Sequence, residues 1–127
     1  MGTFVVSYLY INAALYFFFA VWCLIKPDQT ADFSGLKLMN GSGRSEYLTI
    51  YAGLQAGLAG FYIFAALKEE MQLPAILFSL FLYAGILLVR LTSLATLKGV
   101  KKGTYYIATM ELLLGIGALT SYLCFPE

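Results

Sequence analysis

Two ionisable side chains stand deep inside long apolar stretches of this sequence, and they are the residues most able to do chemistry. Arg90 lies eight residues before Lys98, and Glu111 lies seven residues after Thr104. At the rise of an α-helix, both positions fall roughly 10–12 Å inside the same end of two antiparallel neighbours. An unpaired charge costs several kcal/mol in the interior of a bilayer, so we expect a direct ion pair between them.

Three further polar residues can face the same interior. Glu46 stands at the start of another apolar stretch, and Tyr51 and Gln55 follow it at spacings of five and four residues. Such spacings place side chains on roughly one face of a helix. We therefore predict a polar cluster made of Glu46, Tyr51, Gln55, Arg90 and Glu111.

Two interpretations of this cluster stay open. In the first, the Arg90–Glu111 pair only fixes the register of two helices. In the second, Arg90 holds an anionic headgroup or substrate, and Glu46 and Glu111 orient it or carry protons. Two acids against one deep arginine favour the second interpretation, unless Arg44 at the mouth of the cluster neutralises the surplus acid.

The composition points away from metals, cofactors and nucleic acid. Histidine is absent, which removes the commonest metal ligand and the usual proton carrier near neutral pH. The two cysteines, Cys23 and Cys124, have no CxxC spacing. We therefore expect no metal site, no cofactor and no catalytic residue. The net charge of +1 gives no reason to expect nucleic acid as a partner.

The elements that position the cluster are predicted to be membrane-spanning helices. The chain of 127 residues is 61% hydrophobic and 12% charged, against roughly 25% charged in soluble domains, so lipid must surround most of its surface. Four apolar segments are each long enough to cross the hydrocarbon core. We predict an all-α integral membrane four-helix bundle that forms a single domain over residues 1–127. The four transmembrane helices are expected at about 4–25, 46–67, 74–97 and 104–125.

Local residue preferences predict where these helices begin and how the first two are connected. Ser45 suits the N-cap of the second helix, Pro74 suits the start of the third, and Thr104 suits the N-cap of the fourth. The connection 26–45 mixes apolar residues with polar residues and glycine. It is expected to be a short interfacial segment at headgroup depth or a cap folded over the bundle, with a flexible loop as the third alternative.

The second predicted helix carries a stripe of small residues. Gly53, Gly57 and Gly60 recur at spacings of four and three residues, which lets another helix approach closely in lipid. We expect this stripe to pack against other helices or to form a homo-oligomer. Tyr8, Tyr10, Tyr62 and Tyr122 fall near the predicted outer boundary, where tyrosine commonly forms an interfacial belt.

Basic residues predict the orientation of the chain. Loops 26–45 and 98–103 carry six lysines and arginines, whereas the opposite side carries only Lys68. The positive-inside rule places both loops in the cytoplasm and both termini outside. We therefore expect a multi-pass protein of the cell inner membrane.

The chain resembles the DUF4345 family of small bacterial four-helix membrane proteins through three features. These are the segment EYLTIYAGLQAGLAGFY that begins at Glu46, the sequence RLTS that begins at Arg90, and Glu111 in the last helix. The resemblance covers essentially the whole chain, and its most specific part is the pattern EYxxxYxG. It implies the fold and the key polar residues but no activity, because the family is uncharacterised. A distant likeness to DoxX-type four-helix proteins concerns the fold alone.

Three functions compete at this point. The favoured one is a non-enzymatic membrane protein whose polar cluster binds a lipid headgroup or small amphiphile, or supports a partner membrane protein. The second is a small transporter or channel, assembled as an oligomer through the glycine stripe. The third is an enzyme or quinone-linked redox subunit in which Tyr51, Glu46 and Arg90 polarise a quinone or a carbonyl.

Overall fold

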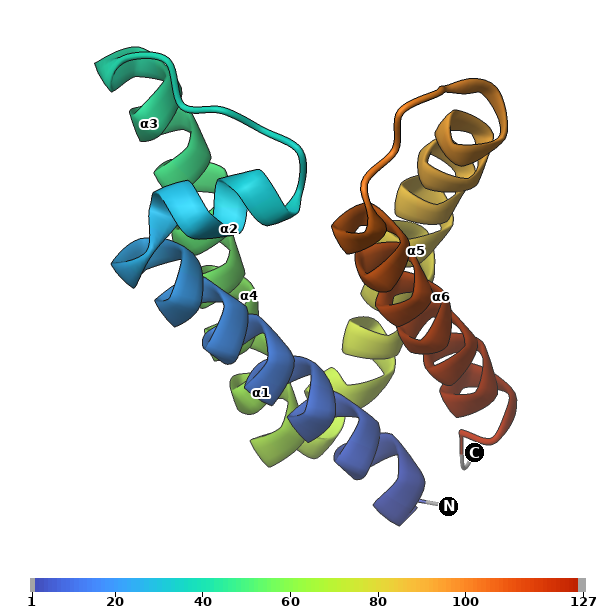
Figure 1. The fold of residues 1–127 in the computed structure, drawn as a ribbon. Helices are drawn as coiled ribbons and strands as arrows, with labels where there is room; N and C mark the ends of the chain where they lie inside the picture. Colours follow the sequence, from blue (N-terminus) through green and yellow to red (C-terminus); the bar gives the residue numbers. More distant parts are fainter. Residues whose placement is uncertain (1, 126–127) are drawn as a thin grey trace.

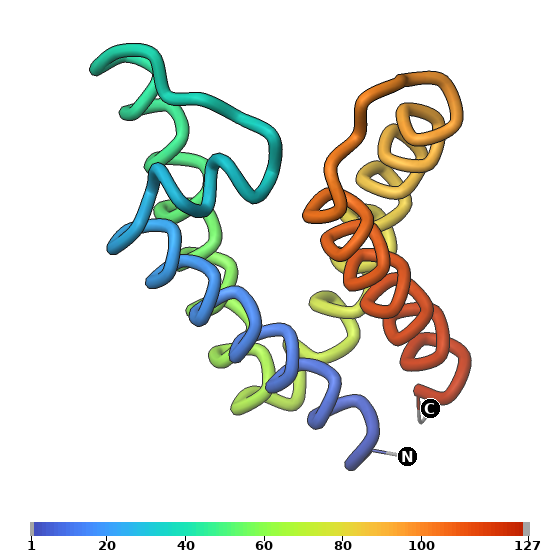
Figure 2. Tube along the Cα trace, viewed as in Figure 1, coloured from blue at the N-terminus to red at the C-terminus, as the bar shows by residue number. Residues whose placement is uncertain are grey.

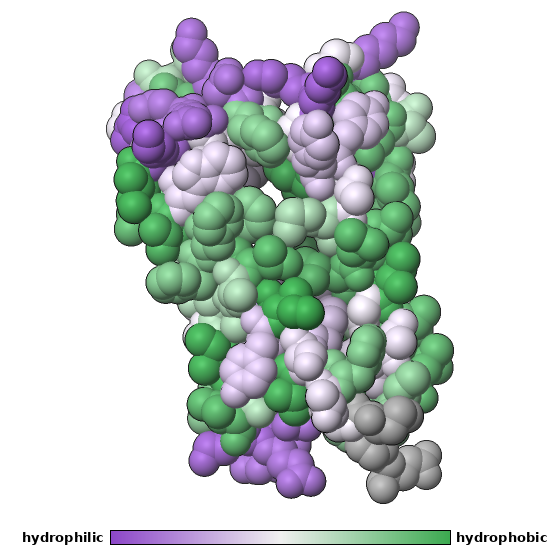
Figure 3. Space-filling model, turned by 60° about the horizontal axis from the view of Figure 1, so that its bottom comes forward, coloured by the Kyte–Doolittle hydropathy of each residue, from purple (hydrophilic) through white to green (hydrophobic). Residues whose placement is uncertain are grey.

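The computed structural model of this protein describes residues 2–125, and within that range every regular element is a helix. Four helical spans are long and apolar enough to cross a membrane. Hydrophilic surface gathers at the two ends of the molecule, and hydrophobic surface lies between them (Figure 3). The predicted all-α four-span membrane fold is therefore confirmed. The elements are α1 (Gly2–Ile25), α2 (Pro27–Phe33), α3 (Gly41–Leu48), the π-helix η1 (Thr49–Leu54), α4 (Gln55–Leu67), α5 (Glu69–Thr96) and α6 (Lys102–Leu123).

The second span begins earlier than its sequence suggested, because a different residue caps it. α3, η1 and α4 follow one another without a break, and the Asn40 side chain accepts a hydrogen bond of 2.8 Å from the backbone N–H of Gly43. This bond satisfies a donor that the first turn of a helix leaves without a partner. The prediction that Ser45 is the N-cap is therefore wrong.

Two other predicted helix starts are also wrong. α5 begins at Glu69, so Pro74 lies inside the helix. Pro74 is the sixth residue of α5, so the helix lacks the hydrogen bond that an N–H at this position would donate to the Glu70 carbonyl. α6 begins at Lys102 with Lys101 as its N-cap, rather than at Thr104.

The spans form two antiparallel hairpins. α1 packs along η1 and α4, and α5 packs along α6. The hairpins meet near the short turn between α4 and α5 and splay apart toward the opposite end (Figures 1 and 2). The main core lies where they meet, and its small side chains allow close helix contact. Its buried members are Val5, Tyr8, Leu9, Ala13, Tyr62, Ala65, Ala66, Ala75, Ile76, Tyr83 and Ala118.

The short helix α2 connects the two hairpins at the splayed end, where it reaches from the end of α1 toward the start of α6 (Figure 1). On the α6 side, the Phe33 ring stacks on Tyr106 with 6.4 Å between ring centroids, and Lys101 Nζ donates to the Asp32 carbonyl over 2.8 Å. A Cβ atom on Gly103 would lie 1.9 Å from the Phe33 carbonyl oxygen, so only glycine fits there.

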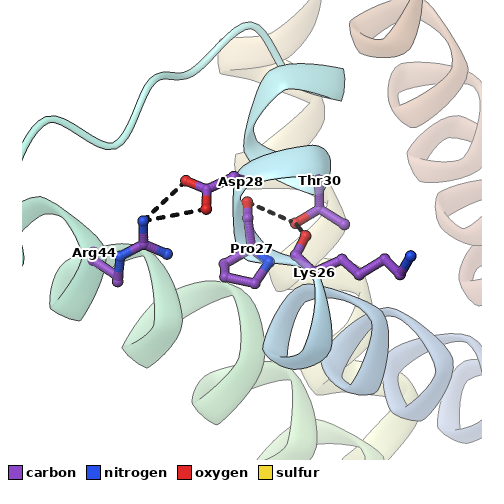
Figure 4. A network of polar contacts seen from close by, with 5 residues as sticks. All are labelled: Lys26, Pro27, Asp28, Thr30 and Arg44. Carbon is purple, nitrogen blue, oxygen red and sulfur yellow. Dashed lines mark hydrogen bonds and ion pairs between the residues drawn. The ribbon is translucent and has the colours of Figure 1, made fainter.

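On its other side, α2 is held by α3. The Tyr47 hydroxyl donates to Thr30 Oγ1 over 2.8 Å, and Arg44 reaches Asp28. Figure 4 shows the Arg44 guanidinium directed at both carboxylate oxygens of Asp28. With contacts to both hairpins, residues 27–33 fold over the splayed end of the bundle and are not a flexible loop.

Candidate functional site

The Arg90 and Glu111 side chains are in direct contact. Arg90 Nε donates to Glu111 Oε1 over 2.8 Å, and Arg90 Nη2 donates to Glu111 Oε2 over 3.1 Å. This two-point arrangement is the strongest geometry available to an arginine and a carboxylate. Arg90 lies six residues before the end of α5, and Glu111 lies nine residues after the start of α6, which puts them roughly 9 and 14 Å along the spans.

The pair leaves part of the guanidinium unused. Arginine has five N–H donors, and two of them are engaged by Glu111. Among residues 2–125, the Nη1 atom of Arg90 has no hydrogen-bond acceptor. The Arg90 side chain is 30% exposed and that of Glu111 is 17% exposed. The guanidinium can therefore still donate hydrogen bonds to an additional anionic group.

One tyrosine of the other hairpin reaches the helix that carries Arg90. The Tyr16 hydroxyl of α1 is hydrogen-bonded to that of Tyr83, which lies seven residues before Arg90 on α5. Tyr51 belongs to η1, and its ring stacks on Tyr47 with 4.4 Å between centroids. π-Helical segments often occur at functional sites. The pair itself lies on α5 and α6, and Tyr16 of α1 meets α5 through Tyr83.

Two residues of the predicted cluster are not joined to the pair. Glu46 is exposed and Gln55 is half-buried. Within residues 2–125, neither side chain makes a hydrogen bond or an ion pair. The alternative that Arg44 neutralises the surplus acid of the cluster has no support, because Arg44 pairs with Asp28 over 3.0 Å.

A second set of polar side chains, which sequence reasoning missed, lies buried between the hairpins. Asn12, Tyr16 and Tyr83 are connected by hydrogen bonds of 2.6 Å. Close by, the Tyr62 and Ser79 hydroxyls lie 2.5 Å apart, and the Tyr8 hydroxyl donates to the Leu114 carbonyl over 2.6 Å.

Tyr8 and Tyr62 are therefore core residues and not members of an interfacial belt. The one available sequence signal was Asn12, a strongly polar residue inside an apolar stretch. A buried amide requires hydrogen-bond partners, and here these are the Tyr83 hydroxyl of α5 and the Tyr8 carbonyl of α1 itself.

An open apolar groove of about 450 Å³ runs between α1 and α6. At one end of the groove, Leu15 and Met110 adjoin Tyr16 and Glu111 in sequence, so the groove reaches the depth of the ion pair. The groove presents almost no polar surface. It is lined by Phe4, Ser7, Tyr8, Ile11, Leu15, Met110, Leu113, Leu114 and Gly117.

The glycine stripe does not pack against the rest of this chain. Gly53, Gly57 and Gly60 are exposed. A Cβ atom on Gly57 or Gly60 would meet no atom of the described residues within 4 Å. Tyr62, Ala65 and Ala66 of this span are buried in the core, and Leu58 and Phe61 pack against it. The role of the stripe in an oligomer stays a prediction.

Comparison with known proteins gives one match. A family model described as a domain of unknown function (DUF4345) matches residues 6–122, which is nearly the whole chain. Neither the curated proteins nor the solved structures contain a significant match.

Proposed function

Since the chain belongs to the DUF4345 family, whose function is unknown, we propose a function from the site alone. The protein binds a membrane amphiphile with an anionic headgroup. The headgroup lies at Arg90, and the hydrocarbon chain lies in the groove between α1 and α6. The observation that carries this proposal is the partly exposed Arg90–Glu111 pair, whose guanidinium keeps unused donors at membrane depth.

The energetic cost of a charge within a bilayer and the geometry of the Arg90–Glu111 pair both support a binding role. Charged side chains within a bilayer are expensive and usually mark a ligand or ion pathway. Glu111 holds the guanidinium with two hydrogen bonds, so Arg90 is oriented before any ligand arrives. A pre-oriented arginine suits phosphate or carboxylate oxygens, which accept charge-assisted hydrogen bonds.

The groove supports an amphiphile over a free anion. It is apolar along its length, and two of its lining residues, Leu15 and Met110, lie at about the depth of the polar pair. An occupant that matches both parts needs a charged end and a hydrocarbon chain. A free anion would match only the pair.

The binding test uses an affinity titration in detergent micelles. The probes are a short-chain phospholipid and an alkyl glucoside of the same chain length, which carries no anion. Arg90→Gln should weaken phospholipid binding by about tenfold or more, because hydrogen bonds to charged groups contribute about 1.5–3 kcal/mol.

Arg44→Gln is the matched control, because Arg44 makes an ion pair of similar length at an exposed position. It should leave phospholipid binding unchanged. Equal affinity for the phospholipid in the wild type and in Arg90→Gln would contradict the proposal, and so would equal binding of the alkyl glucoside.

We further propose that the basic end faces the cytoplasm of the cell inner membrane and that both termini lie outside. The support is the bias of Lys and Arg toward loops 26–45 and 98–103. Alkaline phosphatase fused within the turn at Lys68 should be active, and the same enzyme fused in loop 98–103 should be inactive. The reverse pattern would overturn this orientation.

The exposed face of α4 supports a homo-oligomer as a second proposal. Gly57 and Gly60 leave open space beside the helix backbone, and such a surface allows a close contact between helices of two copies. A transporter or channel of this size would require this assembly. Gly57→Leu should convert an oligomer to monomers in size-exclusion chromatography with light scattering, and a monomeric wild-type protein would refute the proposal.

A further inference from the structure

A hydrogen-bond chain with a defined direction runs from the core to the proposed headgroup site. Asn12 Nδ2 donates to the Tyr8 carbonyl over 2.9 Å. The Tyr83 hydroxyl lies 2.6 Å from Asn12 Oδ1, and the Tyr16 hydroxyl lies 2.6 Å from that of Tyr83. Asn12 is fully buried and Tyr83 is 2% exposed, so water does not replace these partners.

Each donor in this chain is fixed by chemistry. The Tyr8 carbonyl can only accept, so the amide nitrogen of Asn12 must face it and Oδ1 must face Tyr83. Because Oδ1 can only accept, Tyr83 must donate to it. A tyrosine hydroxyl has one hydrogen, and that of Tyr83 is used. Tyr16 must therefore donate to Tyr83.

This direction determines what Tyr16 can offer to a ligand. Its hydrogen is committed to Tyr83, so its oxygen can only accept further hydrogen bonds. Leu15 and Met110, the sequence neighbours of Tyr16 and Glu111, line the same groove between α1 and α6, so Tyr16 and Glu111 lie at similar depth. The site thus places an acceptor at Tyr16, an acidic group at Glu111 and unused donors at Arg90.

The charge of the site adds a second constraint. Arg90 and Glu111 together are neutral. A purely anionic headgroup would add an uncompensated negative charge at membrane depth, which is costly. A headgroup with both signs of charge would leave the site neutral, with its cation near Glu111.

We propose that this site selects a zwitterionic headgroup whose ammonium group carries N–H donors. The anionic group of the ligand binds Arg90, one ammonium N–H donates to the Tyr16 oxygen, and the positive charge of the ammonium lies near Glu111. This inference rests on the proposed binding function and assigns Tyr16 as a residue that determines specificity. An ethanolamine phospholipid has this chemistry, whereas a choline phospholipid has the same charges and no N–H.

The test compares four short-chain phospholipids that differ only in methylation of the amine: ethanolamine, monomethyl, dimethyl and choline. Wild-type protein should bind the first three with similar affinity and the choline lipid about tenfold more weakly or worse, because only the last lacks an N–H donor. The wild-type series needs no substitution, so it decides the proposal even if a variant fails to fold.

Two substitutions then test whether Tyr16 and Tyr83 cause the difference in affinity between the lipids. Tyr16→Phe should remove the step between the dimethyl and choline lipids. Tyr83→Phe should release the Tyr16 hydrogen and raise the affinity for phosphatidic acid, a headgroup that mainly accepts. A purely structural role for Tyr83 predicts no gain in affinity for any lipid. That result would overturn the assigned direction of the chain.

The outcomes separate this inference from the binding function on which it rests. Equal wild-type affinity for ethanolamine and choline lipids overturns the selectivity. The binding function still holds in that case if Arg90→Gln lowers the affinity for both lipids. If Arg90→Gln changes neither affinity, both the selectivity and the binding function are wrong.

Discussion

The two arginine–carboxylate pairs of this protein form a matched experiment on burial. Arg90–Glu111 has hydrogen bonds of 2.8 and 3.1 Å, and Arg44–Asp28 has hydrogen bonds of 3.0 and 3.2 Å. Their exposure differs more than their geometry. The first pair is 30% and 17% exposed, and the second is 43% and 70% exposed. A difference in coupling free energy between the two pairs would therefore reflect the difference in their burial.

The expected magnitude follows from screening. Two unit charges about 4 Å apart attract by about 1 kcal/mol in water and by about 4 kcal/mol at an effective dielectric constant of about 20. The cost of desolvating both groups offsets part of the larger value. We expect a coupling free energy of about 2 kcal/mol for Arg90–Glu111 and less than about 0.5 kcal/mol for Arg44–Asp28.

Double-mutant cycles with alanine at all four positions measure both couplings. The free energy of unfolding is read by circular dichroism as SDS is added to micelles of a mild detergent. Arg90→Ala and Glu111→Ala should each destabilise the protein by about 2–3 kcal/mol, because each leaves a charge without its partner. The double variant should lose about as much free energy of unfolding as either single variant. Additive effects at Arg90 and Glu111, or equal couplings in the two pairs, would refute the reasoning.

Three further predictions concern packing. Gly103→Ala should destabilise the fold and increase proteolysis of α2, since its Cβ atom would overlap the Phe33 carbonyl; normal protease resistance would contradict the close contact. Ser79→Ala should lower the free energy of unfolding by about 1–3 kcal/mol and by more than Tyr62→Phe, because it leaves a buried tyrosine hydroxyl without a partner. The opposite order would contradict this hydrogen bond. Gly57→Ala should raise the free energy of unfolding of a monomer by about 0.5–1 kcal/mol, because alanine favours a helix and no described atom opposes it; a loss would indicate a hidden contact.

The four spans and the contact between Arg90 and Glu111 could be predicted from the sequence for two physical reasons. Apolar length is a direct consequence of bilayer thickness, so four spans follow from composition and spacing. The contact between Arg90 and Glu111 follows from equal depth on consecutive antiparallel helices, together with the cost of an unpaired charge.

The other features of the fold and of the site could not be predicted, because they depend on contacts between residues far apart in the chain. Tyr83 meets Asn12 across 71 positions, and nothing local to Tyr83 separates a core tyrosine from a boundary tyrosine. The π-helical turn at Thr49–Leu54 has no residue pattern of its own. The packing of α2 over the splayed end required both hairpins to be in place before Gly103 could be recognised as a contact point.

The central claim is that an amphiphile binds with its headgroup at Arg90 and its chain between α1 and α6. A phospholipid with a photoreactive group in its chain tests this most directly, when crosslinked peptides are mapped by mass spectrometry. We predict crosslinks concentrated on the groove near Leu15 and Met110 in the wild type and in Arg44→Gln, and their loss in Arg90→Gln. Crosslinks spread evenly over the lipid-facing surface, unchanged in Arg90→Gln, would contradict the claim.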